Sequence, residues 1–258
     1  LRLTGFGQTG PYSSYPGFAT IVDALSGFSN LLGEPQGTPS LPPIALADEL
    51  TALVGAFSVM LALRHAEKRG EGQEIDVNLL TSMFQIMGAL PSAYAHMGYL
   101  QPRLGSGIPY TVPRGTYKSA DNIWLAISCS SDSVSDRVLN LLGLNDDPRF
   151  VNFQSRSKNR ELLEGYVKEW VGKRTYSEVL DKFREADAAV GKVMSMEEIF
   201  TDEHFLSRDM ITDVEGVQMQ NLVAKLYKSP GNLRHPGRKF NQNSKEILRR
   251  YSKKKRKR

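Results

Sequence analysis

The chain has 258 residues, enough to bury a substantial core, and its hydrophobic content of 40% and charged content of 24% are ordinary values for a globular protein. A net charge of +5 suggests nucleic-acid binding, but Lys253–Arg258 are all basic and the rest of the chain is nearly neutral, which argues against that class. The single Cys129 excludes an internal disulfide and a cysteine-cluster metal site, and it suits a reducing compartment.

The basic tail has three interpretations: a solvated end, a nuclear address or a tether to an anionic surface. We favour a solvated end, because a run of like charges repels itself and buries nothing. No signal peptide is visible. The longest apolar run, Leu50–Leu63, is too short to span a bilayer and indicates a buried helix.

The chain begins LRLTGFGQTGPY, without Met, and Leu1–Thr4 predicts the end of a strand. Glycines and prolines then open a turn, which includes the first glycine loop (Gly5–Gln8). A glycine-rich turn after a strand is where α/β proteins place ligands. Because the strand has almost no beginning, we expect either that the chain starts within a domain or that a partner chain supplies what precedes it.

The next segments alternate between helix, loop and strand. The apolar spacing over Ile21–Leu32 predicts a helix, and the prolines and glycines of Gly33–Pro43 predict a loop. A long helix follows from near Asp48, with basic residues in its last turn before Gly70. The stretch GQEIDVNLL predicts a strand, and a connecting helix is expected from Leu80 to about Tyr99.

A second compositional block begins at Leu104 and predicts two strands with a turn at Ala120–Asn122. Further elements follow in order, and the whole pattern predicts an α/β protein with a smaller second domain. The expected later elements are helices at Ser133–Leu142, Asn159–Trp170 and Tyr176–Ala186, short helical pieces at Met196–Ile199 and His204–Ser207, a strand–turn–strand unit within 214–233, and a last helix from Glu246.

Asp48 is the residue that physical reasoning singles out. It lies between an apolar approach and an apolar helix, where backbone N–H groups and the helix dipole favour an anion. Two interpretations remain open at this point. Asp48 is either a helix N-cap or a nucleophilic carboxylate held at the positive end of the helix.

Other candidates are weaker. The second glycine loop (Gly105–Gly107) precedes a strand, and short glycine loops are usually plain turns. The four histidines show no metal-ligand spacing, so no metal site is predicted. Cys129 has no basic neighbour in sequence to lower its pKa, which favours a strand end over a thiol nucleophile.

Read together, a series of motifs resembles the family III CoA-transferases, the group of formyl-CoA transferase and the carnitine CoA-transferases. The motifs occur in family order over nearly the whole chain. They are GFGQTGPY, PGF with ALSGF, GEPQGTP, LADELTALVGAF, GEGQEIDVNLL, GTYKSADNIWLAIS, DDPRF, RSKNRELL and MSMEEIFTDEHFLSRDM.

The resemblance implies an incomplete Rossmann-like large domain with a smaller α+β domain, because family members carry a further segment before GFGQTGPY. It implies a division into the remainder of the large domain with the catalytic Asp (1–79), a linker helix (80–104), the small domain (105–210), a C-terminal return segment (211–252) and the basic tail (253–258).

The resemblance also implies the chemistry. Asp48 matches the family's catalytic aspartate, which passes CoA from an acyl-CoA to a free carboxylic acid through an aspartyl-CoA thioester. The substrate- and CoA-binding residues carried over are Gly5, Phe6, Gly7, Gln8, Gly105, Ser106 and Gly107. CoA is then a cosubstrate, with no permanently bound cofactor.

Two alternatives stay open. The α-methylacyl-CoA racemases share the fold, but they pair the aspartate with a His where this chain has Phe18. A non-catalytic or split-enzyme subunit is the second alternative. The resemblance further implies a cytoplasmic protein that forms an interlocked homodimer, or that joins a partner chain carrying the missing N-terminal half.

Overall fold

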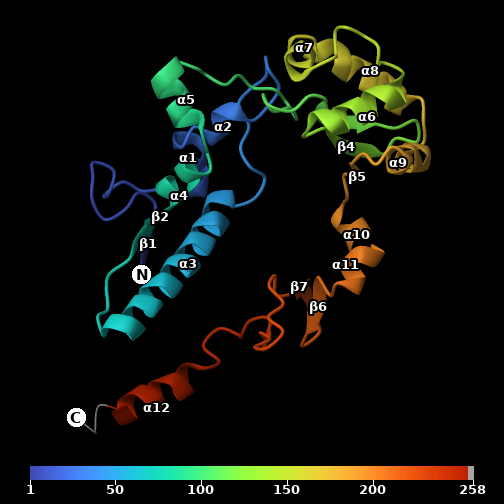
Figure 1. The fold of residues 1–258 in the computed structure, drawn as a ribbon. Coiled ribbons are helices and arrows are strands. Elements are labelled where there is room, and N and C mark those ends of the chain that lie inside the picture. Colours follow the sequence, from blue (N-terminus) through green and yellow to red (C-terminus); the bar gives the residue numbers. More distant parts are fainter. Residues whose placement is uncertain (255–258) are drawn as a thin grey trace. The chain divides into compact units, whose positions relative to one another are not determined.

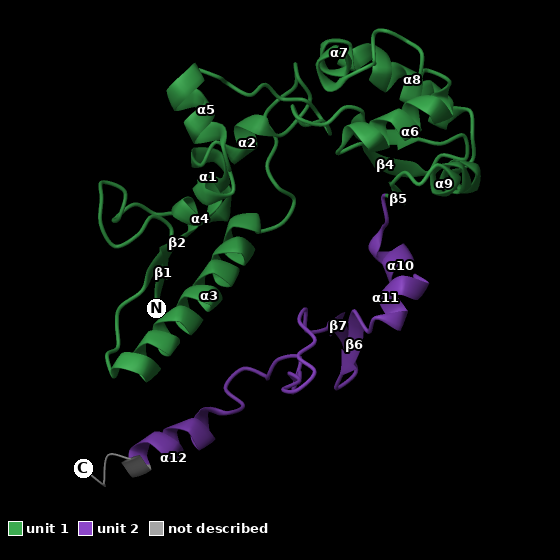
Figure 2. Ribbon diagram, in the orientation of Figure 1, with its two compact units in different colours: residues 1–192 green, residues 193–258 purple. Residues whose placement is uncertain are grey.

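The computed structural model describes residues 1–254, which divide into two compact units, residues 1–192 and the residues from 193 onward (Figure 1 and Figure 2). Most of the basic tail, residues 255–258, lies outside the described residues, so the interpretation of the tail stays a prediction. The finer five-part division expected from the sequence also stays a prediction.

The first half of unit 1 is built on a short parallel strand pair. Strand β1 (Arg2–Thr4) pairs with β2 (Asp76–Asn78), and Arg2 lies opposite Asp76. Parallel strands need a long crossover connection, and here that connection contains helices. They are α1 (Ala19–Leu25), α2 (Phe28–Leu31) and α3 (Leu46–Arg69), while α4 (Leu79–Gln85) and α5 (Leu90–Met97) follow β2.

Helix α3 begins two residues earlier than the sequence suggested. Its N-cap is Ala45, without a side-chain capping bond, and Asp48 is the third helical residue. The N-cap interpretation of Asp48 is therefore wrong. The predicted C-terminus is confirmed, because Lys68 and Arg69 lie in the last turn and Gly70 closes the helix with φ 75°.

Two expected helices are each split by a glycine in the left-handed region. Gly27, with φ 87°, separates α1 from α2 within the predicted Ile21–Leu32 helix. Gly88, with φ 60°, lies between α4 and α5, so the expected connector from Leu80 is not continuous. Glycine adopts this conformation without the steric cost of a Cβ, and helices commonly end there.

Helices α1, α3 and α4 pack together to form a small apolar core, called here the α1–α3–α4 core. Phe6, Phe28, Leu46, Leu50 and Leu80 pack partly buried against it. Its buried members are Ala19, Val22, Ala47, Leu79 and Met83.

Beyond this core, α3 carries apolar side chains that no other described residue covers, such as Leu53, Phe57 and Met60. By length and apolar composition, this 24-residue helix could cross a membrane, a test that core helices of soluble proteins also pass. The predicted helix over Leu50–Leu63 is confirmed as part of this longer helix, but the prediction that it is buried is wrong for the described structure. Only Thr51 and Gly55 of the run are buried, because helices α1 and α4 cover one side of the start of α3.

The second half of unit 1 is an antiparallel sheet with helices packed against it (Figure 1). The sheet has the order β3 (Arg114–Lys118), β4 (Trp124–Ser128) and β5 (Val190–Lys192). The predicted turn between its first two strands is confirmed. The helices are α6 (Asp132–Leu142), α7 (Phe153–Lys158), α8 (Arg160–Gly172) and α9 (Tyr176–Glu185), of which all but α7 were predicted.

Unit 2 holds short elements and a terminal helix. The sequence predicted a strand–turn–strand unit within 214–233, but the hairpin runs from Ile211 to Gln220. Its turn is made by Glu215 and Gly216, which are both at positive φ. The elements are α10 (Met196–Ile199), α11 (Glu203–Ser207), β6 (Ile211–Val214), β7 (Val217–Gln220) and α12 (Ser244–Lys254).

Arg156 is the largest fully buried side chain in the described part of the chain. Its guanidinium donates to the carbonyl oxygens of Val112 at 3.2 Å and Phe150 at 3.4 Å, and it also pairs with Asp132. Three segments far apart in sequence are thus held by one planar group with several donors.

We predict that Arg156→Met destabilises the protein by about 1–3 kcal/mol, because the Phe150 carbonyl loses its guanidinium donor and the Val112 carbonyl keeps only the Ser135 hydroxyl. The free energy of unfolding in urea measures this loss. The matched control Arg184→Met changes an exposed arginine of α9 and is expected to shift that free energy by less than about 0.5 kcal/mol. Equal effects of the two variants would contradict a structural role for Arg156.

Candidate functional site

The first glycine loop follows β1 directly and is held by hydrogen bonds from its backbone. The Gly7 N–H donates to Thr4 Oγ1 at 2.9 Å, and the Gln8 N–H donates to Asp76 Oδ2 at 2.9 Å. The side chain of Gln8 accepts from Arg2 at 3.0 Å. Because Gly7 has φ 93°, a residue with a Cβ would strain this turn.

Phe6 joins this loop to the start of α3. Its ring packs against the α1–α3–α4 core, to which Leu46 and Ala47 of α3 also belong. The ring also lies over Gly17, where an added Cβ would stand 2.6 Å from Phe6 Cε2. The bare backbone of Gly17 therefore lets the ring reach the core.

Asp48 lies in the first turn of α3 with an exposed side chain. Its neighbours on the helix, Ala47 and Thr51, are fully buried, and Thr51 Oγ1 donates to the Ala47 carbonyl at 2.6 Å. The carboxylate therefore stands on a fixed backbone at the positive end of a long helix.

A second carboxyl, that of Asp23, lies on α1, which packs against α3. The side chain is 2% exposed, and Oδ1 has no hydrogen-bond partner. Burial raises the pKa of Asp23, and the negative charge of Asp48 raises that pKa further. The sequence analysis missed Asp23, although the spacing of Ala19, Val22, Asp23 and Ser26 places it on the buried face of the helix.

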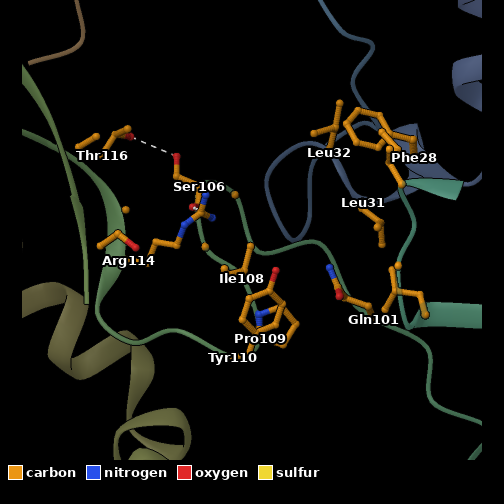
Figure 3. A pocket seen from close by; sticks show the side chains of 18 of the residues that line it. Phe28, Leu31, Leu32, Gln101, Ser106, Ile108, Pro109, Tyr110, Arg114 and Thr116 are labelled. Atoms are coloured by element: carbon orange, nitrogen blue, oxygen red, sulfur yellow. Dashed lines mark hydrogen bonds between the residues drawn. The ribbon is translucent and has the colours of Figure 1, made fainter. Parts of the chain in front are cut away.

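The second glycine loop is fixed to both halves of unit 1. The Gly105 N–H donates to the Gly33 carbonyl at 3.1 Å. On the other side, Arg114 donates to the Ser106 carbonyl at 2.7 Å, and the hydroxyls of Ser106 and Thr116 lie 3.2 Å apart (Figure 3).

Two more arginines donate hydrogen bonds to backbone carbonyl oxygens of the segments beside this loop. Arg103 donates to the carbonyls of Asn30, Glu34 and Gly37 at 3.0–3.4 Å. Arg160 donates to three carbonyls on the other side, those of Ile108, Pro109 and Thr111.

A cavity of about 1110 Å³ opens beside the second glycine loop (Figure 3). One wall is apolar and includes Phe28, Leu31 and Leu32, and another contains the loop itself and Arg114. Its size suits a large ligand. Asp48 and the first glycine loop do not line it, so the structure brings the second loop, but not Asp48, to this cavity.

Tyr117, Glu164 and Cys129 lie close together at the small sheet. Tyr117 donates to Glu164, and burial is the main cause that raises the pKa values of both side chains. Burial also raises the pKa of the Cys129 thiol to about 12, so the thiol is protonated at neutral pH. This agrees with a strand-end role for Cys129.

Among the residues that the structure describes, no three His, Cys, Asp or Glu side chains are grouped so that they could hold a metal ion.

We predict that Arg103→Ala loosens the loop 33–37 and the second glycine loop together. The variant removes three hydrogen bonds to backbone carbonyls, and a loss of about 1.4 kcal/mol corresponds to about tenfold faster amide exchange. Hydrogen–deuterium exchange of peptides covering 33–37 and 105–107 measures the change. Arg234→Ala, at an exposed position in unit 2, is the control and is expected to leave these peptides unchanged.

The fold has close counterparts among solved structures. A CAIB/BAIF family protein from Brucella suis superposes with a TM-score of 0.82 over 96% of this chain and 66% of that one, at 26% identity. A hypothetical protein from Mycobacterium tuberculosis gives a TM-score of 0.81 at 20% identity, covering 96% of this chain and 67% of that one. These likenesses define an α/β protein of the CaiB/BaiF fold.

Residues 1–243 match the model of CoA-transferase family III, and the chain belongs to that family. It is 35% identical to the succinyl-CoA–L-malate CoA-transferase alpha subunit of Chloroflexus aurantiacus over 96% of this chain. The corresponding beta subunit from that organism is 34% identical over 96% of this chain and 64% of its own length. A succinate–glutarate CoA-transferase of Agrobacterium fabrum is 29% identical over 95% of this chain and 63% of its own length.

The chain spans 60% of the length of the first of these relatives. The resemblance read from the sequence motifs is confirmed, as is the predicted fold class.

Proposed function

We propose that the protein takes part in moving CoA from an acyl-CoA to a free carboxylic acid, with Asp48 as the covalent nucleophile. The observation that carries the proposal is an exposed carboxylate in the first turn of the 24-residue helix α3. Membership of a CoA-transferase family supports the reaction class.

The surroundings of Asp48 suit a nucleophile. The positive end of the helix dipole stabilises the carboxylate and, later, the oxyanion formed when it attacks a carbonyl. The buried neighbours Ala47 and Thr51 fix the backbone that carries it. The carboxylate therefore needs little reorganisation to react.

The chemistry proceeds by near-balanced exchanges. The Asp48 carboxylate attacks the acyl-CoA carbonyl, which gives a mixed anhydride and the CoA thiolate. The thiolate attacks the Asp48 carbonyl, which releases the donor acid as a carboxylate and leaves an Asp48–CoA thioester. The acceptor carboxylate then takes CoA by the same steps in reverse, and Asp48 is restored.

We assign supporting roles to the two glycine loops. The first glycine loop would contact the acyl-CoA at the end of β1. The second glycine loop would cover the intermediates and exclude water, which would otherwise hydrolyse the anhydride. The cavity beside the second loop has room for acyl and pantetheine groups.

Short dicarboxylic acids are the substrate class we propose. The relatives named above are called succinyl-CoA, malate and glutarate CoA-transferases. Arg114, which lines the cavity, offers a cation for the second carboxylate of such a substrate.

The proposal extends to the assembly. The relatives called alpha and beta subunits support partnership with a second chain, either a copy of this one or a chain that supplies further parts of the site. We propose that the assembly acts in the cytoplasm and binds CoA only as a cosubstrate.

A racemase is the competing reaction on this fold, and Phe18 argues against it. Racemisation needs a proton donor and acceptor on each side of the α-carbon. The benzyl side chain of Phe18, 76% exposed at the start of α1, cannot move a proton.

Intact-protein mass spectrometry after incubation with succinyl-CoA tests the proposal. We expect a CoA-sized adduct that maps to the peptide containing Asp48 and that Asp48→Asn abolishes, because the amide is a far weaker nucleophile. Glu49→Gln is the matched control, since it changes another exposed carboxylate in the same helical turn, and the adduct is expected to persist.

An adduct that survives in Asp48→Asn would exclude Asp48 as the nucleophile. If no adduct forms with the chain alone, the same assay is repeated with the second chain supplied. Absence of the adduct there too would overturn the transferase mechanism.

A further inference from the structure

We propose that Asp23 is a positioning residue that holds a proton beside Asp48, so that the two carboxyls together carry one negative charge and that charge resides on Asp48. This inference rests on the proposed function, in which Asp48 must be an anion when it meets the acyl-CoA.

The first support is the burial of Asp23. Its side chain is 2% exposed on α1, a helix that packs against α3 and α4. An ionised carboxylate in such a place loses the hydration that stabilises its charge. Asp48, by contrast, is exposed at the start of a helix, so the more favourable place for the charge is on Asp48.

The second support is the hydrogen bonding of Asp23. Oδ1 is buried without a partner. The hydroxyl of Ser26, the C-cap of α1, is used elsewhere, because Ser26 Oγ donates to the Asp23 backbone carbonyl at 3.0 Å. A buried carboxylate oxygen without donors is costly, whereas a protonated carboxyl needs fewer of them and can itself donate.

The third support is the set of charges around Asp23. Helices α2 and α4, which pack against α1, carry no titratable side chain, and neither does the rest of α1. On α3 the first turn carries Asp48 and Glu49. Burial is the main cause that raises the pKa of Asp23, and the charge of Asp48 raises that pKa further. No cation among the described residues lowers that pKa.

The coupling between Asp23 and Asp48 means that the pKa of Asp23 changes as Asp48 reacts. While Asp48 is a free carboxylate, burial and the charge of Asp48 both favour the protonated form of Asp23. When Asp48 becomes an anhydride or a thioester, that charge is gone and the pKa of Asp23 falls. A protonated Asp23 also avoids placing a second negative charge next to the oxyanion that forms when Asp48 attacks.

Carboxyl-carbon NMR titration of the ¹³C-aspartate-labelled protein tests the coupling without any substrate. We expect Asp23 to titrate above the ordinary range for aspartate, and Asp48→Asn to shift its midpoint downward. The control Asp181→Asn, at an exposed site on α9, is expected to leave the Asp23 midpoint unchanged.

The raised pKa of Asp23 also makes the stability of the folded protein depend on pH. Because the folded-state pKa of Asp23 is raised, its contribution is present at low pH and is lost as the pH rises through that folded-state pKa. Asp23→Asn, a neutral group of the same shape, is expected to abolish this loss in urea unfolding measured across pH.

The rate of adduct formation on Asp48 gives the functional readout. In the wild-type protein the rate is expected to fall about tenfold per pH unit above the Asp23 midpoint, and Asp23→Asn is expected to remove that fall. A purely structural role for Asp23 would lower the rate equally at every pH.

The proposal is overturned if Asp23 titrates in the ordinary range and Asp48→Asn leaves its midpoint in place. It is also overturned if the alkaline fall in rate persists in Asp23→Asn. Should no adduct form in any variant even with the second chain supplied, the transferase function fails, and the titration in the wild type and in Asp48→Asn still decides whether Asp23 holds the proton.

Discussion

The packing of α1 and the first glycine loop against the first turn of α3 is the contact on which the candidate site depends. Val22 from α1 and Ala47 from α3 are both fully buried in the α1–α3–α4 core, and Phe6 reaches it from the loop. This apolar contact fixes the backbone immediately before Asp48. The backbone that carries the exposed Asp48 carboxylate is therefore fixed by the burial of neighbouring residues rather than by hydrogen bonds to the carboxylate oxygens.

Around the second glycine loop, order comes from arginines that bind backbone carbonyls. Arg103, Arg114 and Arg160 each donate to carbonyl oxygens of irregular segments, which have no partners within a helix or sheet. A guanidinium can satisfy several such oxygens at once because its donors lie in one plane. The same device, at Arg156, holds the core of the small sheet region. Loops rich in glycine and proline thus gain defined positions without secondary structure.

The sequence predicted most elements, because their apolar spacing and turn residues agree with the observed structure. It misplaced the ends of helices where glycine acts through its conformation, as at Gly27 and Gly88, since a glycine within apolar spacing does not reveal its φ angle. It found Asp48 from the pattern of charge and helix start. It missed Asp23 because the partner of a buried carboxyl lies on another helix, and neither Asp23's burial nor its lack of a hydrogen bond can be read from spacing alone.

Because the Phe6 ring lies so close to Gly17, the position of the Asp48 carboxylate depends on a residue that has no side chain. A methyl group at Gly17 would stand 2.6 Å from the ring, so either the ring or the Gly17 backbone would have to shift. A shift of the ring would disturb its packing against the core that supports the first turn of α3. Gly17 is therefore expected to tolerate few substitutions, although it lies far along the chain from Asp48. A substitution there would alter the position of the Asp48 carboxylate and leave its chemical nature unchanged.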